Sequence, residues 1–213
     1  MSSMTTSSST HPKIILVLEL NRSHLDMIRA HFLDLGDTDR RLRFGMQVSD
    51  EFITSYVDSF KFNTDSFFGV FDSTLNIIGL AHLAYGNDST LNNHIAEFGV
   101  SVSENGRGIG VGTALFKRSA IHARNTNITA LYIHCLSSNA AMMHIARKAG
   151  MVVEYSYGEA DAYLSLPPGN PKSIMIEALQ DQSAVIDYSI KQNFNRAVFN
   201  SRLLCNLFPR FGS

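Results

Sequence analysis

The sequence predicts an α/β (α+β) protein with one mixed, mostly antiparallel sheet of about seven strands flanked by helices. Three observations carry this expectation. Strand-like and helix-like segments are intermixed up to residue 167. Three strand-like segments, 66–72, 76–85 and 91–103, follow one another with only turns between them, which favours antiparallel pairing. Beyond the Pro-Gly segment 167–171, apolar residues recur at helical spacing, which predicts a C-terminal helical extension.

Size and charge indicate one globular domain with extensions. The chain has 213 residues, of which 45% are hydrophobic and 17% charged, with a net charge of -1. A pI near 6.7 gives no basic surface that suggests nucleic acid. No segment has the roughly 18 apolar residues that a membrane span needs. We therefore expect neither nucleic acid nor membrane as a partner.

The N-terminal segment MSSMTTSSSTHPK lacks the apolar stretch of a secretory signal. We expect a disordered leader over 1–12, a domain over 13–167, an extension over 168–213, and a cytoplasmic location. Two cysteines, Cys135 and Cys205, lie far apart in the sequence, and a buried free thiol is expected for Cys135 inside its strand.

The first half of the domain begins with a buried strand over 13–20. A helix over 23–35 follows, because its apolar residues recur at helical spacing. A basic, irregular connection over 39–49 leads to a second helix over 51–60, for which Asp50 is a candidate cap. The three consecutive strands come next.

The second half alternates helices and strands before the extension. A helix is expected over 112–124 and a strand over 129–136. The helix over 138–150 has Ser138 or Asn139 near its cap and Gly150 as its stop. Two strands, MVVEYS and DAYLSL, close the domain. The helical stripe of the extension consists of Met175, Leu179, Ile186, Ile190, Phe194 and Val198.

A glycine-rich run lies where the last of the three strands gives way to a helix. In SENGRGIGVGTALF (103–116), every second residue from Gly106 to Gly112 is glycine. Glycine lets an anion reach the backbone, and the first N–H groups of a helix offer donors and the positive end of the helix dipole. The run therefore predicts a phosphate site, with a glycine turn that binds nothing as the alternative. It fits neither the G-x-G-x-x-G of dinucleotide folds nor a Walker loop.

Residues 107–112 read R-G-x-G-x-G, and here the sequence resembles the GCN5-related N-acetyltransferase (GNAT) superfamily, whose acyl-CoA loop reads Q/R-x-x-G-x-G/A. The resemblance spans about 13–166 and includes the order of strands and helices. It implies the GNAT fold, acetyl-CoA as co-substrate and transfer of an acetyl group to a primary amine. The implied cofactor-binding residues are Val100, Val102, Arg107, Gly108, Ile109, Gly110, Val111, Gly112, Thr113 and Asn139.

These implied roles differ in kind. The backbone around Val100 and Val102 would bind the pantetheine arm and polarise the thioester carbonyl. The loop would bind the pyrophosphate. Arg107 would add positive charge, unless it is simply a solvated arginine, and Asn139 is either a CoA contact, a helix cap, or both.

Glu97 is the candidate general base. Acetyl transfer needs a deprotonated amine, and a carboxylate near the thioester can remove the proton. Glu97 is a lone charge in the apolar strand IAEFGVSV, and the family often places its base on this strand. An exposed glutamate without a catalytic role is the alternative.

The candidate acid departs from the family pattern N-x-x-A-x-x-x-Y-x-K-x-G-F. Aligning Asn139, Lys148 and Gly150 puts Ala146 where the tyrosine would stand. Tyr155 is our substitute candidate; Tyr157 and His144 are within the same reach. The missing tyrosine keeps a second hypothesis open, a catalytically impaired acyl-CoA-binding regulatory module. The histidines show no metal-ligand spacing, so no metal is expected, and His134 is interpreted as a strand residue.

The acceptor and the assembly stay open. The family usually forms its acceptor wall between the first helices, where the segment 39–49 can receive an acidic acceptor or form a solvated loop with internal salt bridges. We expect a small-molecule or peptide amine as acceptor, and a monomer or homodimer. The apolar stripe of 174–204 is expected to pack on the same chain rather than on a neighbouring protomer.

Overall fold

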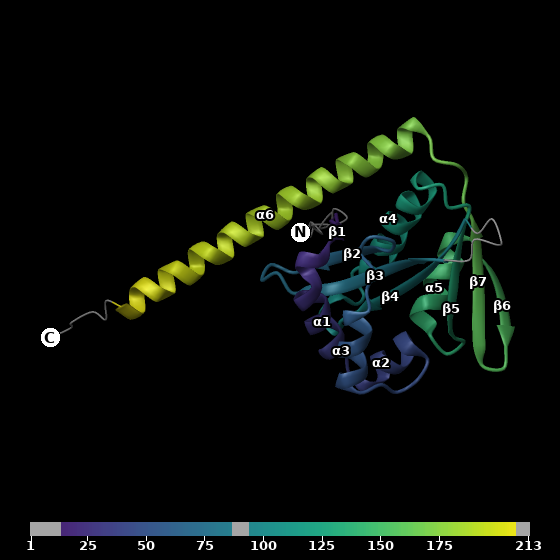
Figure 1. The fold of residues 1–213 in the computed structure, drawn as a ribbon, viewed down its shortest axis with the longest axis horizontal. Helices are drawn as coiled ribbons and strands as arrows, with labels where there is room; N and C mark the ends of the chain where they lie inside the picture. The colour runs from purple at the N-terminus through teal and green to yellow at the C-terminus, as the bar shows by residue number, and fades with distance from the viewer. Residues whose placement is uncertain (1–13, 87–93, 208–213) are drawn as a thin grey trace, which may run out of the picture.

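The computed structural model describes residues 14–86 and 94–207, with side chains described as far as residue 201. Its strands form one seven-stranded sheet in the order β1-β2-β3-β4-β5-β7-β6 (Figure 1). The strands are β1 (Leu18–Leu20), β2 (Ser66–Phe71), β3 (Ile77–Tyr85), β4 (Ile95–Val102), β5 (Ala130–Leu136), β6 (Val152–Ser156) and β7 (Glu159–Ser165). The predicted leader, 1–12, lies outside the described residues, as do 91–93 of the predicted third strand.

Antiparallel pairing joins β2 to β3 and β3 to β4, which confirms the prediction from the three consecutive strand segments. In contrast, β4 and β5 run parallel, connected through helix α4 (Val111–Asn125). Their pairing is limited to Ile95–Glu97 against Ala130–Tyr132. Beyond Glu97 the two strands separate, and the sheet opens at the carboxyl ends of both.

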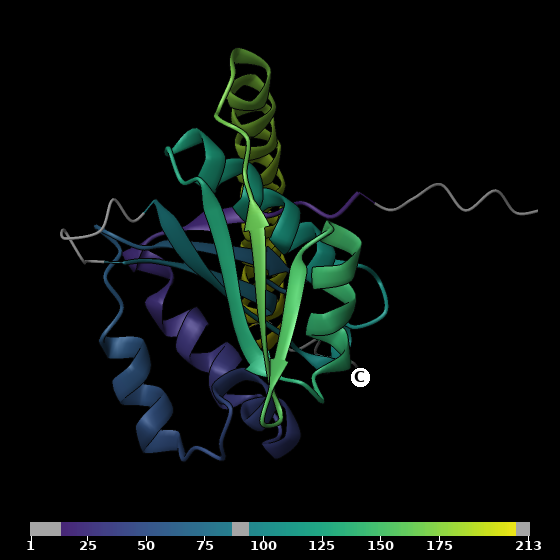
Figure 2. The ribbon, with the colours of Figure 1, turned by 90° about the vertical axis from the view of Figure 1, so that its right-hand side faces the viewer.

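Helices cover both faces of the sheet (Figure 2). Buried residues of α4 and α5 form one core cluster with one face of the sheet, and those of α1 and α3 form a second cluster on the other. The remaining helical elements are η1 (Arg22–His24), α1 (Leu25–Leu33), α2 (Asp37–Phe44), α3 (Asp50–Asp58), η2 (Glu104–Gly106), α5 (Ala140–Ala149) and α6 (Pro171–Leu207). None of the described helices is both long and apolar enough to cross a membrane.

Three predicted details of the N-terminal half are wrong. The first strand is β1 alone, because only Leu18–Leu20 finds partners on β2. Ser49 rather than Asp50 caps α3, since its hydroxyl accepts from the Phe52 amide at 3.3 Å. The segment expected to be irregular over 39–49 contains most of α2.

Helix α2 forms without an apolar stripe, and none of its residues is buried. Asp37 and Asp39 lie in its first turn and Arg41 and Arg43 in its last, so the charges at both ends interact favourably with the helix dipole. Gly45 ends it with a φ of 76°, in the left-handed region. The charges at its two ends and the glycine that ends it therefore indicate this helix in the sequence, whereas the periodicity of apolar residues does not.

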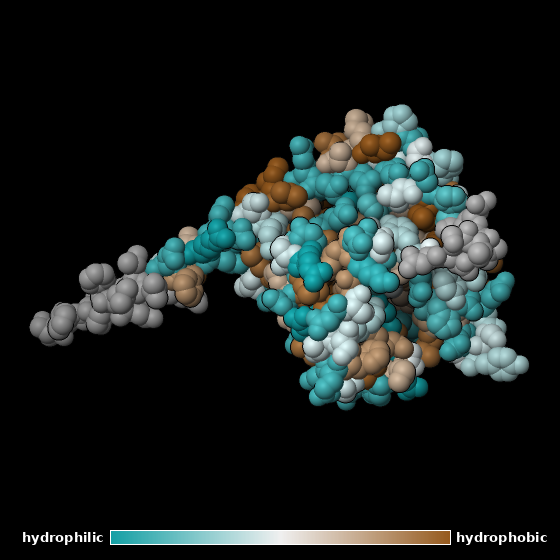
Figure 3. All heavy atoms as spheres, in the orientation of Figure 1, coloured by the Kyte–Doolittle hydropathy of each residue, from teal (hydrophilic) through white to brown (hydrophobic). Residues whose placement is uncertain are grey.

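The apolar stripe of α6 faces outward, which contradicts the prediction that it packs on the same chain. Met175 and Leu179 are 59% and 58% exposed, and Phe194 is 66% exposed. Figure 3 shows such apolar residues along the outer surface of α6. The side that packs on the chain is more polar, with Ser173 and Ala184 buried.

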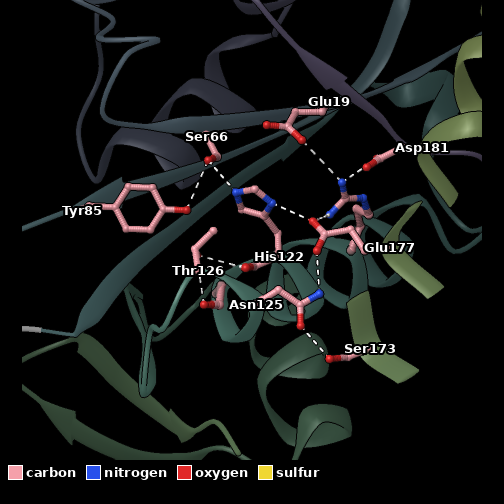
Figure 4. A network of polar contacts seen from close by, with 11 residues as sticks. Glu19, Ser66, Tyr85, His122, Asn125, Thr126, Ser173, Glu177 and Asp181 are labelled. Carbon is pink, nitrogen blue, oxygen red and sulfur yellow. Dashed lines mark hydrogen bonds and ion pairs between the residues drawn. The ribbon is translucent and has the colours of Figure 1, made fainter. Parts of the chain in front are cut away.

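Charge compensation holds α6 against α4. Arg118 on α4 is 2% exposed and donates to Glu177 at 2.8 Å and to Asp181 at 2.6 Å. Glu177 also accepts from His122 at 2.7 Å and from Asn125 at 2.6 Å (Figure 4). Burial alone would raise the pKa of a carboxyl, but the bonds from His122 and Asn125 and the charge of Arg118 outweigh it and lower the pKa of Glu177 to about 2.

Candidate active site

Two cavities meet where β4 separates from β5. The first, here called the loop cavity, has a volume of about 670 Å³ and lies along the glycine-rich loop and α5. The second, the strand cavity, has a volume of about 560 Å³ and lies between α2, α3 and the exposed face of β4 and β5. The residues that line both are Leu42, Arg43, Val100 and Met142. A long ligand in the loop cavity can therefore reach a small molecule in the strand cavity at Val100.

The glycine-rich loop lines the loop cavity with backbone that carries no side chains at its glycines. Gly108 and Gly110 have φ values of 71° and 93°, a region that residues with side chains rarely adopt. Gly110 is the N-cap of α4, and its carbonyl accepts from the Ala114 amide at 3.0 Å. The amides of 111–113 therefore have no acceptor within the helix. They and the helix dipole form the donor set that suits a phosphate.

The structure brings nearly all of the predicted CoA-binding residues together. The predicted residues that line the loop cavity are Val100, Val102, Arg107, Gly108, Gly110, Val111, Gly112, Thr113 and Asn139. Ile109 is the exception; it is 53% exposed and does not line either cavity.

Two of these residues also bind elements of the fold. Arg107 forms an ion pair with Asp39 of α2, so its charge is already partly compensated. The Asn139 side chain accepts from the Met142 amide at 3.0 Å, which confirms the predicted cap of α5. Its amide nitrogen donates to the Leu42 carbonyl at 3.3 Å and so ties α5 to α2.

His31 supports the strand that separates the cavities. Its Nδ1 lies 2.8 Å from the Ile77 carbonyl and its Nε2 lies 2.8 Å from the hydroxyl of Ser101, a residue of the loop cavity. Because a carbonyl only accepts, Nδ1 donates, and Nε2 of the neutral ring accepts from Ser101. Burial lowers the pKa of His31 to about 4, so the ring is neutral near pH 7.

Glu97 lies at the last paired position of β4, opposite Tyr132 of β5. Its side chain is exposed and lines the strand cavity. The predicted general base is therefore within the strand cavity, next to the point where the strands separate.

A second polar group shares this face of the sheet. His134 lines the strand cavity, and its Nδ1 donates to Asp161 of β7 at 2.8 Å. Tyr132 donates to the same carboxylate oxygen at 2.5 Å. The hydrogen bond to Asp161 is the main reason why the pKa of His134 is raised. The prediction placed His134 correctly on a strand but missed its place in a cavity, because its partner Asp161 is distant in sequence and adjacent only through β5–β7 pairing.

Tyr155 does not join the other predicted site residues. It lies on β6, is 58% exposed, and lines neither cavity. Its hydroxyl lies 3.7 Å from the Met143 sulfur and 3.5 Å from Arg147. Ala146, where the family's tyrosine aligns, is fully buried in the core, whereas the face of α5 toward the loop cavity carries His144 and Lys148.

Cys135 is a free, buried thiol as predicted, although it also lines the strand cavity. Burial raises its pKa to about 11. The side chain of Cys205 lies outside the described part of the chain. Within residues 14–86 and 94–207, no group of three or more His, Cys, Asp or Glu side chains is placed to hold a metal ion.

Comparison with known proteins identifies a family and a fold. The family described as "Acetyltransferase (GNAT) family" matches residues 35–151. No relative is found among curated proteins. Solved structures similar to this chain include the GNAT domain of S. lividans PAT, at 18% identity and a TM-score of 0.60, covering 70% of this chain and 89% of that one.

Two further structures carry more specific names. Ribosomal-protein-alanine N-acetyltransferase from Brucella melitensis is 17% identical, with a TM-score of 0.57, and the match covers 71% of this chain and 100% of that one. Spermidine N-acetyltransferase from Vibrio cholerae, in complex with CoA and spermine, is 20% identical, with a TM-score of 0.54 and coverage of 71% and 95%. At these identities the structures establish the fold.

Proposed function

The chain belongs to the GNAT family of acetyltransferases, and from this premise we propose that it is an acetyl-CoA-dependent N-acetyltransferase acting on a primary amine. The observation that carries the proposal is the meeting of the two cavities at Val100. One cavity offers backbone donors for a pyrophosphate, and the other offers a carboxylate for an amine. The neighbouring spermidine N-acetyltransferase, whose structure contains CoA, supports this use of the fold.

The residues that line the loop cavity suit the chemistry of CoA. The first amides of α4 would hold the pyrophosphate, and Arg107 and Lys148 would add positive charge beside it. Gly112 lets α4 and α5 pack closely beside this site, since a Cβ there would lie 3.1 Å from the Ile145 side chain. Backbone groups of Val100 and Val102 would hold the pantetheine arm where β4 still pairs with β3 but no longer pairs with β5. The bound group supplies the acetyl thioester.

Glu97 would take the proton that the acceptor's ammonium must lose before its nitrogen can attack. Its carboxylate faces the strand cavity, where the amine would lie. His134, held by Asp161 on the same face, would pass that proton onward to solvent. The leaving thiol has an ordinary pKa near 8–9, so departure as a thiolate is tolerable without a tyrosine acid.

The alternative, a catalytically impaired acyl-CoA-binding module, rests on the absent tyrosine. Ala146 lies in the core and Tyr155 lies outside the cavities, so neither offers an acid. Retention of Glu97 within the strand cavity favours the enzyme. The two hypotheses predict the same CoA binding and differ only in turnover with an amine.

Binding of CoA is tested by calorimetry on Gly110→Asp. The new side chain would strain a position of φ 93° and bring negative charge to the proposed pyrophosphate site. Gly158→Asp is the matched control, because Gly158 has a φ of 91°, lies in the β6–β7 turn and lines neither cavity. We expect G110D to weaken CoA at least 10-fold and G158D to leave it unchanged. Equal affinity in both variants would remove the loop from the proposal.

Turnover is tested by thiol release from acetyl-CoA with a panel of amines. We expect Glu97→Gln to lower kcat about 100-fold or more without a change in CoA affinity. The loss should be larger at pH 7 than at pH 10, where part of the acceptor amine is already deprotonated. Glu154→Gln, on the exposed edge strand β6, is the control for removing a carboxylate. Full activity of E97Q at pH 7 would place the base elsewhere.

A further inference from the structure

Arg43 is a cation in the strand cavity that pairs with no carboxylate of the described residues. Its Nη2 donates to the Tyr56 hydroxyl at 2.9 Å, and no carboxylate among the described residues forms an ion pair with it. Other arginines with covered side chains do have such partners: Arg40 pairs with Asp50 at 2.7 Å and Arg118 with Glu177 at 2.8 Å. A partly buried charge without a counter-ion is costly, which points to an anion that arrives with a ligand.

The surroundings of Arg43 fix its guanidinium in one place. Its Cζ lies 5.4 Å from the ring centroid of Phe44 and 5.8 Å from those of Phe32 and Tyr56. Such cation–π contacts orient the planar group without neutralising it. On the other side the guanidinium lies against Gly99 of β4, where a Cβ would come within 2.8 Å of Nη2. A glycine at this position leaves room for the arginine.

The position of Arg43 separates it from the proposed pyrophosphate site. Gly99 lies three residues before Val102, which is about 10 Å along a strand, and the glycine-rich loop lies beyond that. Arg43 is therefore at the end of the loop cavity where the acyl group and the acceptor would meet. A neutral thioester carbonyl supplies no counter-charge there, whereas a carboxylate on the acceptor does.

The strand cavity also carries negative charge at a suitable distance. Glu97 lies two residues from Gly99 on the same face of β4, about 7 Å away along the strand. Glu159 lines the same cavity and lies 3.8 Å from His134. A cavity of about 560 Å³ with a cation at one side and carboxylates at the other suits a small molecule with both charges.

We infer that the acceptor is an amino-acid-type molecule, an amine that also carries a carboxylate, and that Arg43 binds this carboxylate while the amine faces Glu97. This inference rests on the proposed N-acetyltransferase function. Arg43 would act as a specificity-determining residue. A guanidinium can bind a carboxylate through two parallel hydrogen bonds, which fixes the orientation of the amine as well as adding affinity.

The test compares matched acceptors on the full chain. Thiol release from acetyl-CoA is measured with the standard amino acids, with their C-terminal amides, and with spermidine. We expect at least one amino acid to exceed its amide and spermidine in kcat/KM by 10-fold or more. Arg43→Gln should lower kcat/KM for that amino acid 10- to 100-fold, mainly through KM, and leave its amide within about threefold. Arg43→Lys keeps the charge but loses the planar fork, so its kcat/KM for the amino acid should lie between those of the parent and R43Q.

Arg41→Gln is the matched control, because Arg41 lies exposed on the same helix and its removal takes away the same charge. Melting temperatures of the variants show whether α2 remains folded. Calorimetry with the corresponding N-acetyl amino acid and its amide gives a second readout, in which R43Q should abolish the preference for the carboxylate.

The outcomes separate this inference from the proposed function. Preferred turnover of spermidine or of amino acid amides would overturn the inference and keep the N-acetyltransferase. An equal loss in R43Q for the amino acid and its amide would assign Arg43 to the thioester carbonyl instead. Failure to bind CoA, or no turnover with any amine, would overturn the proposed function, while the N-acetyl amino acid measurement would still decide whether Arg43 binds carboxylates.

Discussion

Replacing His31 with glutamine is expected to remove part of the acid sensitivity of this fold. The His31 ring bridges the Ile77 carbonyl and Ser101 beneath the loop cavity, and burial lowers its pKa to about 4 from the ordinary 6.5. Between these two values the unfolded chain binds a proton that the folded chain does not. Stability from this group is therefore complete above pH 6.5 and is lost as the pH falls toward 4.

The size of the effect follows from the same two values. The full difference corresponds to about 3 kcal/mol of unfolding free energy, of which about 2 kcal/mol is lost between pH 7 and pH 4.5. Glutamine keeps polar atoms near both partners but does not titrate. The H31Q variant should therefore be less stable than the parent at pH 7. Between pH 7 and pH 4.5, the difference in unfolding free energy between variant and parent should move by about 2 kcal/mol in favour of H31Q.

Urea unfolding at a series of pH values measures this gap directly. His24 and His82 also have lowered pKa values through burial, so the informative quantity is the difference between variant and parent. Ser101→Ala is the control, because it removes one partner of His31 but keeps the buried imidazole. S101A should retain the pH dependence of the parent. A variant H31Q with the parent's pH dependence would refute the view that a buried neutral imidazole is responsible.

Three other predictions follow from the described contacts. Glu177→Gln should lower the unfolding free energy at pH 7 by about 3 kcal/mol in urea titrations, because it removes a carboxylate partner of the buried Arg118. Glu19→Gln, at a side chain 43% exposed, should lower it by less than about 1 kcal/mol. Equal losses in the two variants would contradict the role given to Glu177. Asp161→Asn should lower the pKa of His134 in an NMR titration of the ring protons, and an unchanged pKa would dismiss the hydrogen bond as its cause. Cys135 should react with iodoacetamide at pH 8 about 100-fold more slowly than free cysteine, as followed by mass spectrometry, because burial raises its pKa to about 11.

Local sequence features were sufficient for the three consecutive strands β2, β3 and β4 and for the position of the glycine-rich loop. The consecutive strands required only turns between apolar runs, and the glycine-rich run carries the donor chemistry within a few residues, from Gly108 to Thr113. The position of Glu97 followed in the same way, as one charge in an apolar strand. Each of these inferences depends on residues that are neighbours in the chain.

The strand cavity could not be predicted in this way, because its residues come from different elements. Asp161 reaches His134 only through the pairing of β5 with β7. Arg43 reaches Gly99 only because α2 forms and lies over β4, and α2 has no apolar stripe that periodicity could detect. The contact between a glycine on a strand and an arginine on a helix depends on tertiary packing, and no fixed spacing in the sequence indicates it.

The orientation of α6 shows the same limit most clearly. Counting apolar residues predicts that the stripe with Leu179 and Phe194 packs inward, yet that side is exposed. The surface that α6 covers contains Arg118, and a buried guanidinium requires compensating charge. Among the described residues of α6, Glu177 and Asp181 supply that charge, and they lie on the side opposite the stripe. Turning the helix to bury the stripe would remove both carboxylates from Arg118, so charge compensation between residues about 60 positions apart, rather than local hydropathy, sets which side faces the chain.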